Sequence, residues 1–433
     1  MSDLVAARLE MALSLAFHIV FAAFGIAMPL FMFVAEAFHL RTGEPSYVAL
    51  TKRWAKGTAI FFAVGAVSGT VLSFELGLLW PGFMGGFGSV IGLPFALEGF
   101  AFFTEAIFLG IYLYGWDRVS PRLHCAAGGI VALSGLASAA FVVMANSWMN
   151  TPAGFRLDAA GKVVDVDPVA ACLNPAAFHE IVHVLLSSYC ACGFAVAGVN
   201  AWIVRRDPAN ALAKRALQIA FGIGGGAAIL LPLSGHYSAQ KVAVLEQEKL
   251  AALEGQFATE KGAPLRIGGF PDVAARTTRW AIEIPKGLSF LAFFDPNAEV
   301  KGLDAFAPDD QPDPRIVHPA FQLMVGLGSW LAALAAGAVL LRLWKKKDPW
   351  QVPPLLLALA LSTPLGFAAL EAGWVVTEAG RQPWIIKGVL RTRDAVTPVQ
   401  GLPLELVLFV LVYVVLAFVV YKLGRWNLDH HHA

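Results

Sequence analysis

Hydrophobic positions along the 433-residue chain gather in nine long runs that short polar segments separate. Each run is long enough for a helix to cross a bilayer, which takes about 20 apolar residues. Backbone groups in hydrocarbon must be satisfied within the protein, so each run is expected to be helical. The pattern predicts an all-α, polytopic membrane helix bundle. The predicted spans cover residues 11–37, 54–79, 93–115, 124–148, 178–204, 215–233, 318–341, 352–372 and 404–422.

Composition supports a membrane protein and excludes a nucleic-acid partner. The chain is 57% hydrophobic and only 15% charged, against about 25% charged for a typical soluble domain. The net charge is +1, and no basic stripe is present that could neutralise phosphates. The first run has no charged segment or cleavage site before it, so we expect a retained span. We therefore expect residues 1–433 to form a single membrane domain.

Lysine and arginine in the short loops predict the orientation, because cytoplasmic loops carry the excess. The richer set of loops would be cytoplasmic, which places the N-terminus outside and the C-terminus in the cytoplasm. The segment after the eighth run is more basic than this rule expects. The richer set is Arg41, Lys52, Arg53, Arg118, Arg122, Arg205, Arg206, Lys214, Arg215, Arg342, Lys345, Lys346, Lys347, Lys422 and Arg425, and the poorer set is Arg8, Arg156, Lys162, Arg381, Lys387, Arg391 and Arg393.

One loop on the predicted outer side is far longer than the others. Residues 234–317 form a polar insert between the sixth and seventh runs. Apolar positions near helical spacing predict an amphipathic helix over residues 238–257. The rest is rich in Pro, Gly and Asp, and a loop of this length is usually functional or disordered.

Four side chains that could bind a metal lie at a similar depth in the outer part of the bilayer. They are His18, His183, Met324 and Glu371, the last at the outer end of its span. Ionisable groups inside spans are costly and are functional candidates. Histidine and methionine are a usual axial pair for a haem. Hydrogen-bonded structural histidines and a core methionine remain the alternative.

Two carboxylates on the third run, Glu98 and Glu105, are seven residues apart. Two turns of helix place them on one face, stepping from the outer part towards the middle. This arrangement suits a proton path, either in an oxidoreductase or in a proton-coupled transporter. The alternative is a pair of hydrogen bonds between helices. Glu36 and Glu75 lie near span ends and are expected at the interface.

A competing motif, His179-Glu180-x-x-His183, matches the zinc metalloprotease signature H-E-x-x-H. It would place two imidazoles on one helix face with Glu180 as general base. A third ligand is not evident, because Asp304 and Asp309 lie in the insert. His179 is expected at the membrane edge, where a polar residue needs no special explanation. The protease is therefore the lesser hypothesis.

The remaining possible metal ligands are the cysteines and residues 430–432, and neither set is interpreted as a metal site. Cys190-Ala191-Cys192 lacks the C-x-x-C spacing of redox and zinc sites. With Cys125 and Cys172, these cysteines are expected to be small buried residues. The closing run of residues 430–432 is expected to be a solvated tail.

Residues 373–384 read GWVVTEAGRQPW and resemble the GW-x-x-x-E-x-GRQPW signature of subunit I of cytochrome bd-type quinol oxidases. The resemblance runs from about residue 5 to about residue 425, and the insert is similar to the shorter quinol loop of this family. Further similar blocks are Arg8-Leu9 with Ser14 and Phe17-His18, Ala96-Leu97-Glu98-Gly99-Phe100, Gly115-Trp116-Asp117-Arg118, Asn146-Ser147-Trp148-Met149-Asn150-Thr151-Pro152, Lys249-Leu250-Ala251-Ala252-Leu253-Glu254 and Gln322-Leu323-Met324-Val325-Gly326.

The resemblance implies a set of haem ligands. His183 and Met324 would bind a low-spin haem b that takes electrons from quinol. His18 and Glu371 would bind the two haems of the oxygen-reducing pair, and which residue binds which haem stays open. One of these would be a high-spin haem b, and the other a haem d or a third haem b.

The resemblance also implies roles for other side chains and for partners. Lys249 and Glu254 would contact ubiquinol or menaquinol, although five-residue spacing separates them by about 140° on an ideal helix. Glu98 and Glu105 would deliver protons, and Arg381 and Trp374 would lie near the haems. A second integral subunit and a small single-helix accessory subunit are the expected partners. The enzyme would oxidise quinol outside a bacterial cytoplasmic membrane and reduce oxygen with cytoplasmic protons, without a pump.

Overall fold

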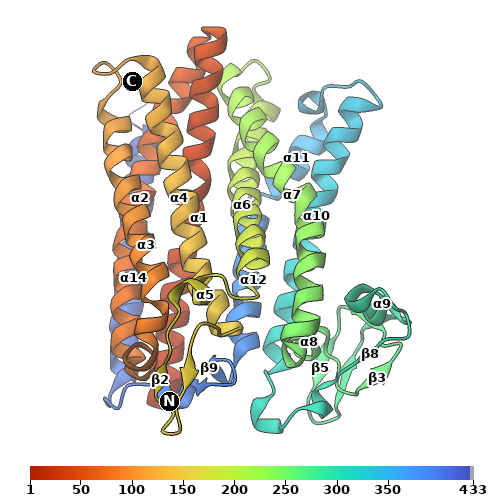
Figure 1. Cartoon of the computed structure of the whole chain (residues 1–433). Coiled ribbons are helices and arrows are strands. Elements are labelled where there is room, and N and C mark those ends of the chain that lie inside the picture. The colour runs from red at the N-terminus through yellow and green to blue at the C-terminus, as the bar shows by residue number, and fades with distance from the viewer. Residues whose placement is uncertain (430–433) are drawn as a thin grey trace.

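The computed structural model describes residues 1–429, and in this range nine helical segments are long and apolar enough to cross a membrane. The predicted all-α membrane bundle is confirmed (Figure 1). The eighth segment is divided in two. The helices are α1 (Asp3–Thr42), α2 (Pro45–Leu79), α3 (Pro81–Tyr114), α4 (Pro121–Asn150), α6 (Ala177–Arg206), α7 (Ala211–Leu245), α10 (Pro314–Leu343), α11 (Pro353–Leu361) with α12 (Leu365–Arg381), and α14 (Leu402–Asp429).

Local sequence signals set where these helices begin. Proline occupies the first turn of α2, α3, α4, α10 and α11. Its missing N–H costs nothing there, because the first N–H groups of a helix have no partner within the helix. The side chains of Ser2, Ser120 and Asn210 accept backbone N–H bonds at the starts of α1, α4 and α7.

Most of the helices extend beyond the predicted spans. The sixth span was predicted over residues 215–233, but α7 continues to Leu245. Hydropathy finds the apolar middle of a helix and misses polar turns that leave the membrane. The eighth span was predicted as one helix over 352–372, whereas α11 ends at Leu361 and α12 begins at Leu365. Pro364 lies in this break, and the residue before a proline is disfavoured in helical geometry.

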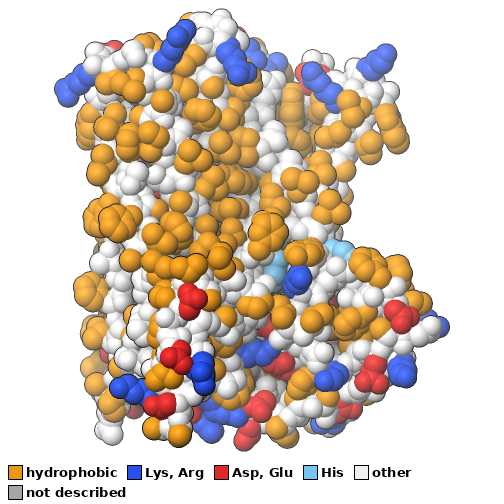
Figure 2. Space-filling view, viewed as in Figure 1, with side chains coloured by type: hydrophobic (Ala, Val, Ile, Leu, Met, Phe, Trp, Pro, Cys, Tyr) orange, Lys and Arg blue, Asp and Glu red, His pale blue; other side chains and the backbone are white. Residues whose placement is uncertain are grey.

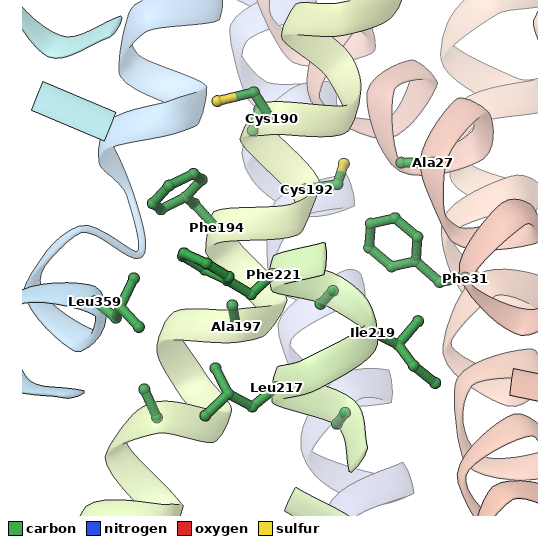
Figure 3. Close-up of a cluster of buried hydrophobic side chains, with 14 of the residues drawn as sticks. Ala27, Phe31, Cys190, Cys192, Phe194, Ala197, Leu217, Ile219, Phe221 and Leu359 are labelled. Carbon is green, nitrogen blue, oxygen red and sulfur yellow. The ribbon is translucent and has the colours of Figure 1, made fainter. Parts of the chain in front are cut away.

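The main core lies where α6 and α7 approach each other most closely. A Cβ on Gly193 would lie 2.4 Å from Cα of Gly224, so only glycine permits this contact. Phe194, Leu217 and Phe221 fill the neighbouring space, with Phe31 of α1 facing them (Figure 3). The four cysteines are free and buried, with Cys190 and Cys192 in this core, as predicted.

The bundle has two distinct ends. The N-terminus and the segment between α7 and α10 lie at one end, called the loop end, and α14 finishes at the opposite end (Figure 1). Lys and Arg gather at the opposite end, whereas acidic and basic side chains mix at the loop end (Figure 2). This separation agrees with the predicted topology. Which end faces the outside stays a prediction.

Ion pairs explain why the segment after α12 is so basic. Arg381 pairs with Glu378, and Lys387 pairs with Glu248 at 2.7 Å. The other two pairs are Arg391 with Asp310 at 2.5 Å and Arg393 with Asp394 at 3.7 Å. The positive charges that opposed the predicted orientation therefore have acidic partners at the same end.

The insert is folded into small elements. The predicted single helix over residues 238–257 is wrong, because α7 ends at Leu245 and α8 (Gln247–Glu254) begins after a break at Glu246. Short antiparallel strand pairs and α9 (Gly287–Phe293) follow. The strands are β3 (Glu260–Lys261), β4 (Leu265–Ile267), β5 (Phe270–Asp272), β6 (Thr277–Arg279), β7 (Ile282–Ile284) and β8 (Glu299–Val300).

Small elements also join the spans at the loop end. The connection from α4 to α6 contains a strand pair and a one-turn helix, and the connection from α12 to α14 does the same. These elements are β1 (Arg156–Leu157), β2 (Val163–Val164), α5 (Pro168–Cys172), β9 (Trp384–Ile386), β10 (Leu390–Arg391) and α13 (Thr392–Ala395). The predicted tail at residues 430–432 lies outside the described residues.

Candidate functional site

Two helix contacts give the relative levels of His18 and Glu371. The rings of Phe24 on α1 and Phe367 on α12 stack at 5.1 Å. His18 is six residues nearer the loop end than Phe24, and Glu371 is four residues nearer than Phe367. At 1.5 Å per residue these offsets are about 9 Å and about 6 Å. The two side chains therefore leave their helices at similar levels.

A second helix contact gives the levels of His183 and Met324. A Cβ on Gly366 would lie 2.6 Å from Cα of Ala191, which fixes α12 against α6. His183 is about 12 Å from that contact towards the loop end. Met324 Sδ lies beside Gly373, which is about 10 Å from the contact in the same direction. Along the bundle axis, the positions of all four candidate ligands therefore differ by no more than about one helical turn.

Hydrogen bonds favour one tautomer of His18. Ser68 Oγ donates to the carbonyl oxygen of Val64 at 2.9 Å. It can then only accept from His18 Nδ1, which lies 2.9 Å away. Nε2 is left with a lone pair, which is the form of imidazole that binds a metal. The absence of a side chain on Gly69 leaves room for the ring, because a Cβ there would lie 3.0 Å from Cε1.

His183 and Met324 lie among α6, α7, α10 and α12. His183 Nδ1 lies 3.3 Å from Ser234 Oγ of α7, so its Nε2 is directed elsewhere. Met324 Sδ would lie 3.0 Å from a Cβ on Gly373, so a side chain at residue 373 would crowd the sulfur. The Met324 sulfur therefore lies where the neighbouring helix has no side chain.

Helix α12 carries two candidate carboxylates. Glu371 lies well inside the helix and not at its outer end, which corrects the predicted position. Its Oε1 is buried without a hydrogen-bond partner. Glu378, two turns further on the same face, accepts bonds from Asn146 Nδ2 at 2.6 Å and Arg381 Nη2 at 2.5 Å. Metal-binding carboxylates are commonly held by such outer bonds, and sequence reasoning gave Glu378 no role.

Arg381 is a buried cation with unused donors. Only Nη2 is bonded, and Nε and Nη1 are buried without partners. A buried guanidinium in this state favours an anionic partner, such as a carboxylate of a bound group. Trp374, one residue after Gly373, packs against the main core. The start of the GRQPW segment therefore presents a buried positive charge beside Glu378.

Lys249 ties the insert to α12. Its Nζ donates to Glu246 Oε2 at 2.6 Å and to Asn150 Oδ1 at 3.2 Å. Its alkyl chain packs on Gly380, where a Cβ would lie 3.0 Å from both Cγ and Cε. Asn150 in turn donates to Glu180 Oε1 at 3.4 Å. The lysine predicted to contact quinol therefore touches the helix that carries Glu371.

Glu254 faces a different part of the insert. It is buried, and its Oε2 has no hydrogen-bond partner. Burial raises the pKa of the Glu254 carboxyl from 4.5 to about 7, and the charge of Arg266 opposes this rise. Lys249 and Glu254 do not converge on one point, which agrees with their predicted angular separation on α8.

The start of α10 holds the insert in place. The ring nitrogens of His318 lie 2.6 Å from the carbonyl oxygen of Leu253 and 3.0 Å from that of Gly268. Gln322 donates to the carbonyl of Arg266 and accepts from the N–H of Gly268. Met324 follows two residues later, so the folded insert is fixed directly to the helix that carries this candidate ligand.

Glu98 and Glu105 lie on one face of α3, as predicted. Ser138 on α4 donates to Glu98 Oε1 at 3.1 Å. Gly135, one turn earlier on α4, lies opposite Glu105, and a Cβ there would be 3.5 Å from both carboxyl oxygens. The two carboxylates therefore form a line between α3 and α4, with Glu105 farther from the loop end.

Glu36 and Glu75, which were predicted to be interfacial, are buried inside the protein and bonded to other helices. Glu36 is 3% exposed, and it accepts from Tyr112 Oη and contacts His124 Nδ1, both at 2.7 Å. Glu75 is 2% exposed and accepts from Ser14 Oγ at 2.5 Å. Position within a span could not reveal these pairings, because they join separate helices.

The H-E-x-x-H residues do not assemble a set of three ligands. His179 is buried in the first turn of α6, and its Nδ1 lies 3.2 Å from Ser238 Oγ. Asp304 instead accepts the backbone N–H and hydroxyl of Thr259. Within residues 1–429, no three His, Cys, Asp or Glu side chains are grouped to hold a metal ion.

Comparison with known families decides among the hypotheses. The profile of the family described as cytochrome bd terminal oxidase subunit I matches residues 6–431. The chain belongs to this family. The resemblance noted in the sequence is confirmed, and with it the prediction of an oxidoreductase of respiratory electron transport.

Individual relatives agree over nearly the whole chain. A Bacillus subtilis (strain 168) protein, provisionally named a cytochrome bd menaquinol oxidase subunit I, is 40% identical over 99% of this chain and 98% of its own. A cytochrome bd ubiquinol oxidase subunit 1 of the same strain is 29% identical, over 100% and 96% respectively. The solved bd oxidase of Geobacillus thermodenitrificans superposes with a TM-score of 0.90 at 38% identity, covering 98% of this chain and 99% of the other.

Family membership fixes the coarse properties of this terminal oxidase subunit. It is a multi-pass membrane protein of a haem-containing, quinol-using enzyme, and its expected partner is subunit II. The residues that carry out each step are a separate question.

Proposed function

We propose that this subunit oxidises quinol at the loop end and carries the haems that reduce oxygen to water. One observation carries the proposal: Lys249 of the insert packs on Gly380 of α12. Glu371, Met324 and His183 lie at similar levels, about 9 to 14 Å along the helices from Gly380. Electron transfer between quinol and a bound haem requires this proximity. The loop end would be the outer face of a bacterial cytoplasmic membrane.

The donor set fits haem iron. His183 and Met324 would bind a low-spin haem b, as a His and Met pair commonly does. His18, with a free Nε2 lone pair, and a carboxylate of α12 would bind the other two haems, a high-spin haem b and a haem d or third haem b. Arg381, with two unused donors, would hold a haem carboxylate, and Trp374 would pack near it. Bound haem supplies the one-electron redox chemistry and the site for oxygen.

Separate substitutions will distinguish the two carboxylates of α12. Glu371→Gln removes a carboxylate without partners, and Glu378→Gln removes one held by Arg381 and Asn146. The variant that replaces the ligand should lose one haem band and most oxygen reduction. The other should keep the band. If both variants keep a full haem complement, neither residue is the ligand.

Lys249 and Glu254 would act on ubiquinol or menaquinol from two sides of α8. Lys249 supplies hydrogen-bond donors near α12. Glu254, with a pKa of about 7, can accept a proton that quinol releases. Protons from quinol would leave at the loop end.

Glu98 and Glu105 would carry protons from the opposite end towards the oxygen site. Each carboxylate can hold a proton without placing a permanent charge in hydrocarbon. Protons consumed at one face and released at the other would make turnover electrogenic without a pump. A small single-helix accessory subunit would complete the complex with subunit II, in the lipid bilayer.

Quinol-driven oxygen consumption by the purified complex tests this proposal. His183→Ala should stop it by removing the low-spin haem. Glu180→Gln should retain it, which would also dispose of the zinc protease hypothesis. Oxygen consumption that persists in His183→Ala would overturn the proposed entry of electrons.

A further inference from the structure

A small acidic cavity lies between α1, α2 and α14 near the loop end, away from the insert. Its volume is about 230 Å³. Its walls include Val71, Phe74 and Phe409, and three carboxylates also line it, those of Glu10, Glu75 and Glu405. Phe74 and Leu78 are exposed on its lipid side. The proposed quinol and proton residues include none of these side chains.

Two of the three carboxylates have buried oxygens without hydrogen-bond partners. Glu10 is 0% exposed, and neither of its oxygens has a hydrogen-bond partner. Glu75 accepts one bond from Ser14, and its Oε2 is buried without a partner. Glu10, Glu75 and Glu405 take part in no ion pair within the described residues.

The surrounding elements provide no positive charge for this cavity. The last turns of α2 and the first turns of α14 contain no Lys or Arg, and Arg8 on α1 is exposed. At this end of the three helices, the titratable groups besides Arg8 and the three carboxylates are Tyr413 of α14 and Asp3 of α1, which accepts backbone bonds from Gly401 and Leu402. Adjacent carboxylates without ion-pair partners in an apolar cavity cannot both stay ionised at neutral pH, because each is poorly solvated and repels the other.

The carboxylates are connected to the His18 site by two helix faces. Glu10, Ser14 and His18 follow at four-residue spacing on α1, and Ser68 and Glu75 lie seven residues apart on α2. Hydrogen bonds from Ser14 to Glu75 and between His18 and Ser68 join the two faces. Along the helices, the carboxylates are about 10 to 12 Å from the level of His18.

We propose that Glu10 and Glu75 form a proton-holding carboxyl pair that takes up a proton when an electron reaches the His18 site. A unit charge about 10 Å away in partly buried protein changes proton affinity by about tenfold. The electron comes from quinol, and the proton comes from water at the loop end through the cavity beside Glu405. One carboxyl O–H bond forms, and it breaks again on reoxidation. The inference rests on the proposed haem at His18.

Redox-difference infrared spectroscopy of the oxidase complex tests the pair. Reduction of the wild type should change a protonated-carboxyl C=O band that shifts in D₂O. Glu10→Gln and Glu75→Gln should each remove this band while the haem content stays full. Glu299→Gln, an exposed glutamate of the insert, is the control and should keep it. A band that persists in both variants would overturn the proposal.

A second measurement can still decide the question if one variant complex does not assemble. The reduction potential of the haem at His18 should fall as pH rises in the wild type, and this dependence should flatten in Glu75→Gln. If Glu10→Gln does not assemble, Glu75→Gln alone decides, because loss of either carboxyl removes the pair.

A wild-type complex without a haem at His18 would instead contradict the proposed function. The pair would then be tested by static infrared spectra at neutral pH. A protonated-carboxyl band that is present in the wild type and lost in both glutamine variants would still support the carboxyl pair. If the wild type lacks this band, the carboxyl pair is rejected.

Discussion

Gly380 shows at the scale of one residue how the insert meets α12, the helix that carries the candidate carboxylate ligands. Lys249 lies flat on this glycine and reaches Asn150 beyond it. The GRQPW segment thus has a steric reason for its glycine. The sequence identified both residues. It could not show that they touch, because they are far apart in the chain.

Gly380→Ala should lower quinol-driven turnover about tenfold and leave the haem spectrum unchanged. The added Cβ would lie 3.0 Å from two carbons of Lys249 and would force the side chain away. Steady-state quinol oxidation with an absorption spectrum checks this. Gly85→Ala is the matched control, because nothing lies within 4 Å of its Cβ position. An unchanged rate would show that the position of Lys249 does not matter for quinol.

Glu254 should make the insert sensitive to pH. Its folded-state pKa of about 7 lies above the ordinary value of 4.5, mainly because of burial. The protonated carboxyl therefore contributes stability that is fully present below about pH 4.5 and is lost as pH rises through about 7. Protease resistance of the insert, measured across this range, should fall with rising pH in the wild type. The curve should be flatter in Glu254→Gln, and equal curves would argue against a buried titrating carboxyl.

At the scale of elements, hydropathy identified the spans and missed their polar pairings. Each predicted run corresponds to helix in the described residues, yet the break at Pro364 and the continuation of α7 to Leu245 were not foreseen. The burial of Glu36, Glu75 and His179 inside the protein was not predicted. Their burial results from partners on other helices, and such partners leave no local pattern in the sequence.

Less of the candidate site than of the fold could be predicted from the sequence. Composition and depth picked out His18, His183, Met324 and the pair on α3. The roles of Lys249 and Arg381 came only from resemblance. Glu378 was missed although it is part of the signature over residues 373–384, because its bond to Asn146 spans 232 residues. Contacts of such separation require the folded structure.

The buried Glu36 and His124 pair should stabilise the junction of α1, α3 and α4. His124→Phe leaves Glu36 with Tyr112 alone, and breaking a buried pair costs about 3 to 5 kcal/mol. A lower unfolding temperature of the complex checks this. The double variant Glu36→Gln with His124→Phe should recover part of the loss. Equal stability of wild type and His124→Phe would show that the pair contributes nothing.

At the scale of the whole molecule, the two ends carry different chemistry. The loop end holds the insert and lies nearer the candidate ligands, and the carboxylate line of Glu98 and Glu105 leads towards the opposite end. This polarity is what an oxidase needs if it releases protons at one face and consumes them at the other. The excess of Lys and Arg at the opposite end supports a cytoplasmic location for it (Figure 2).

The haem content of the purified wild-type complex and of His183→Ala tests the central claim most directly. A pyridine haemochrome assay with a reduced-minus-oxidised spectrum counts each haem type and shows whether haem d is present. The account predicts that His183→Ala loses the low-spin haem b and keeps the haems at His18 and α12. A colourless wild-type complex, or a variant with an unchanged spectrum, would contradict it.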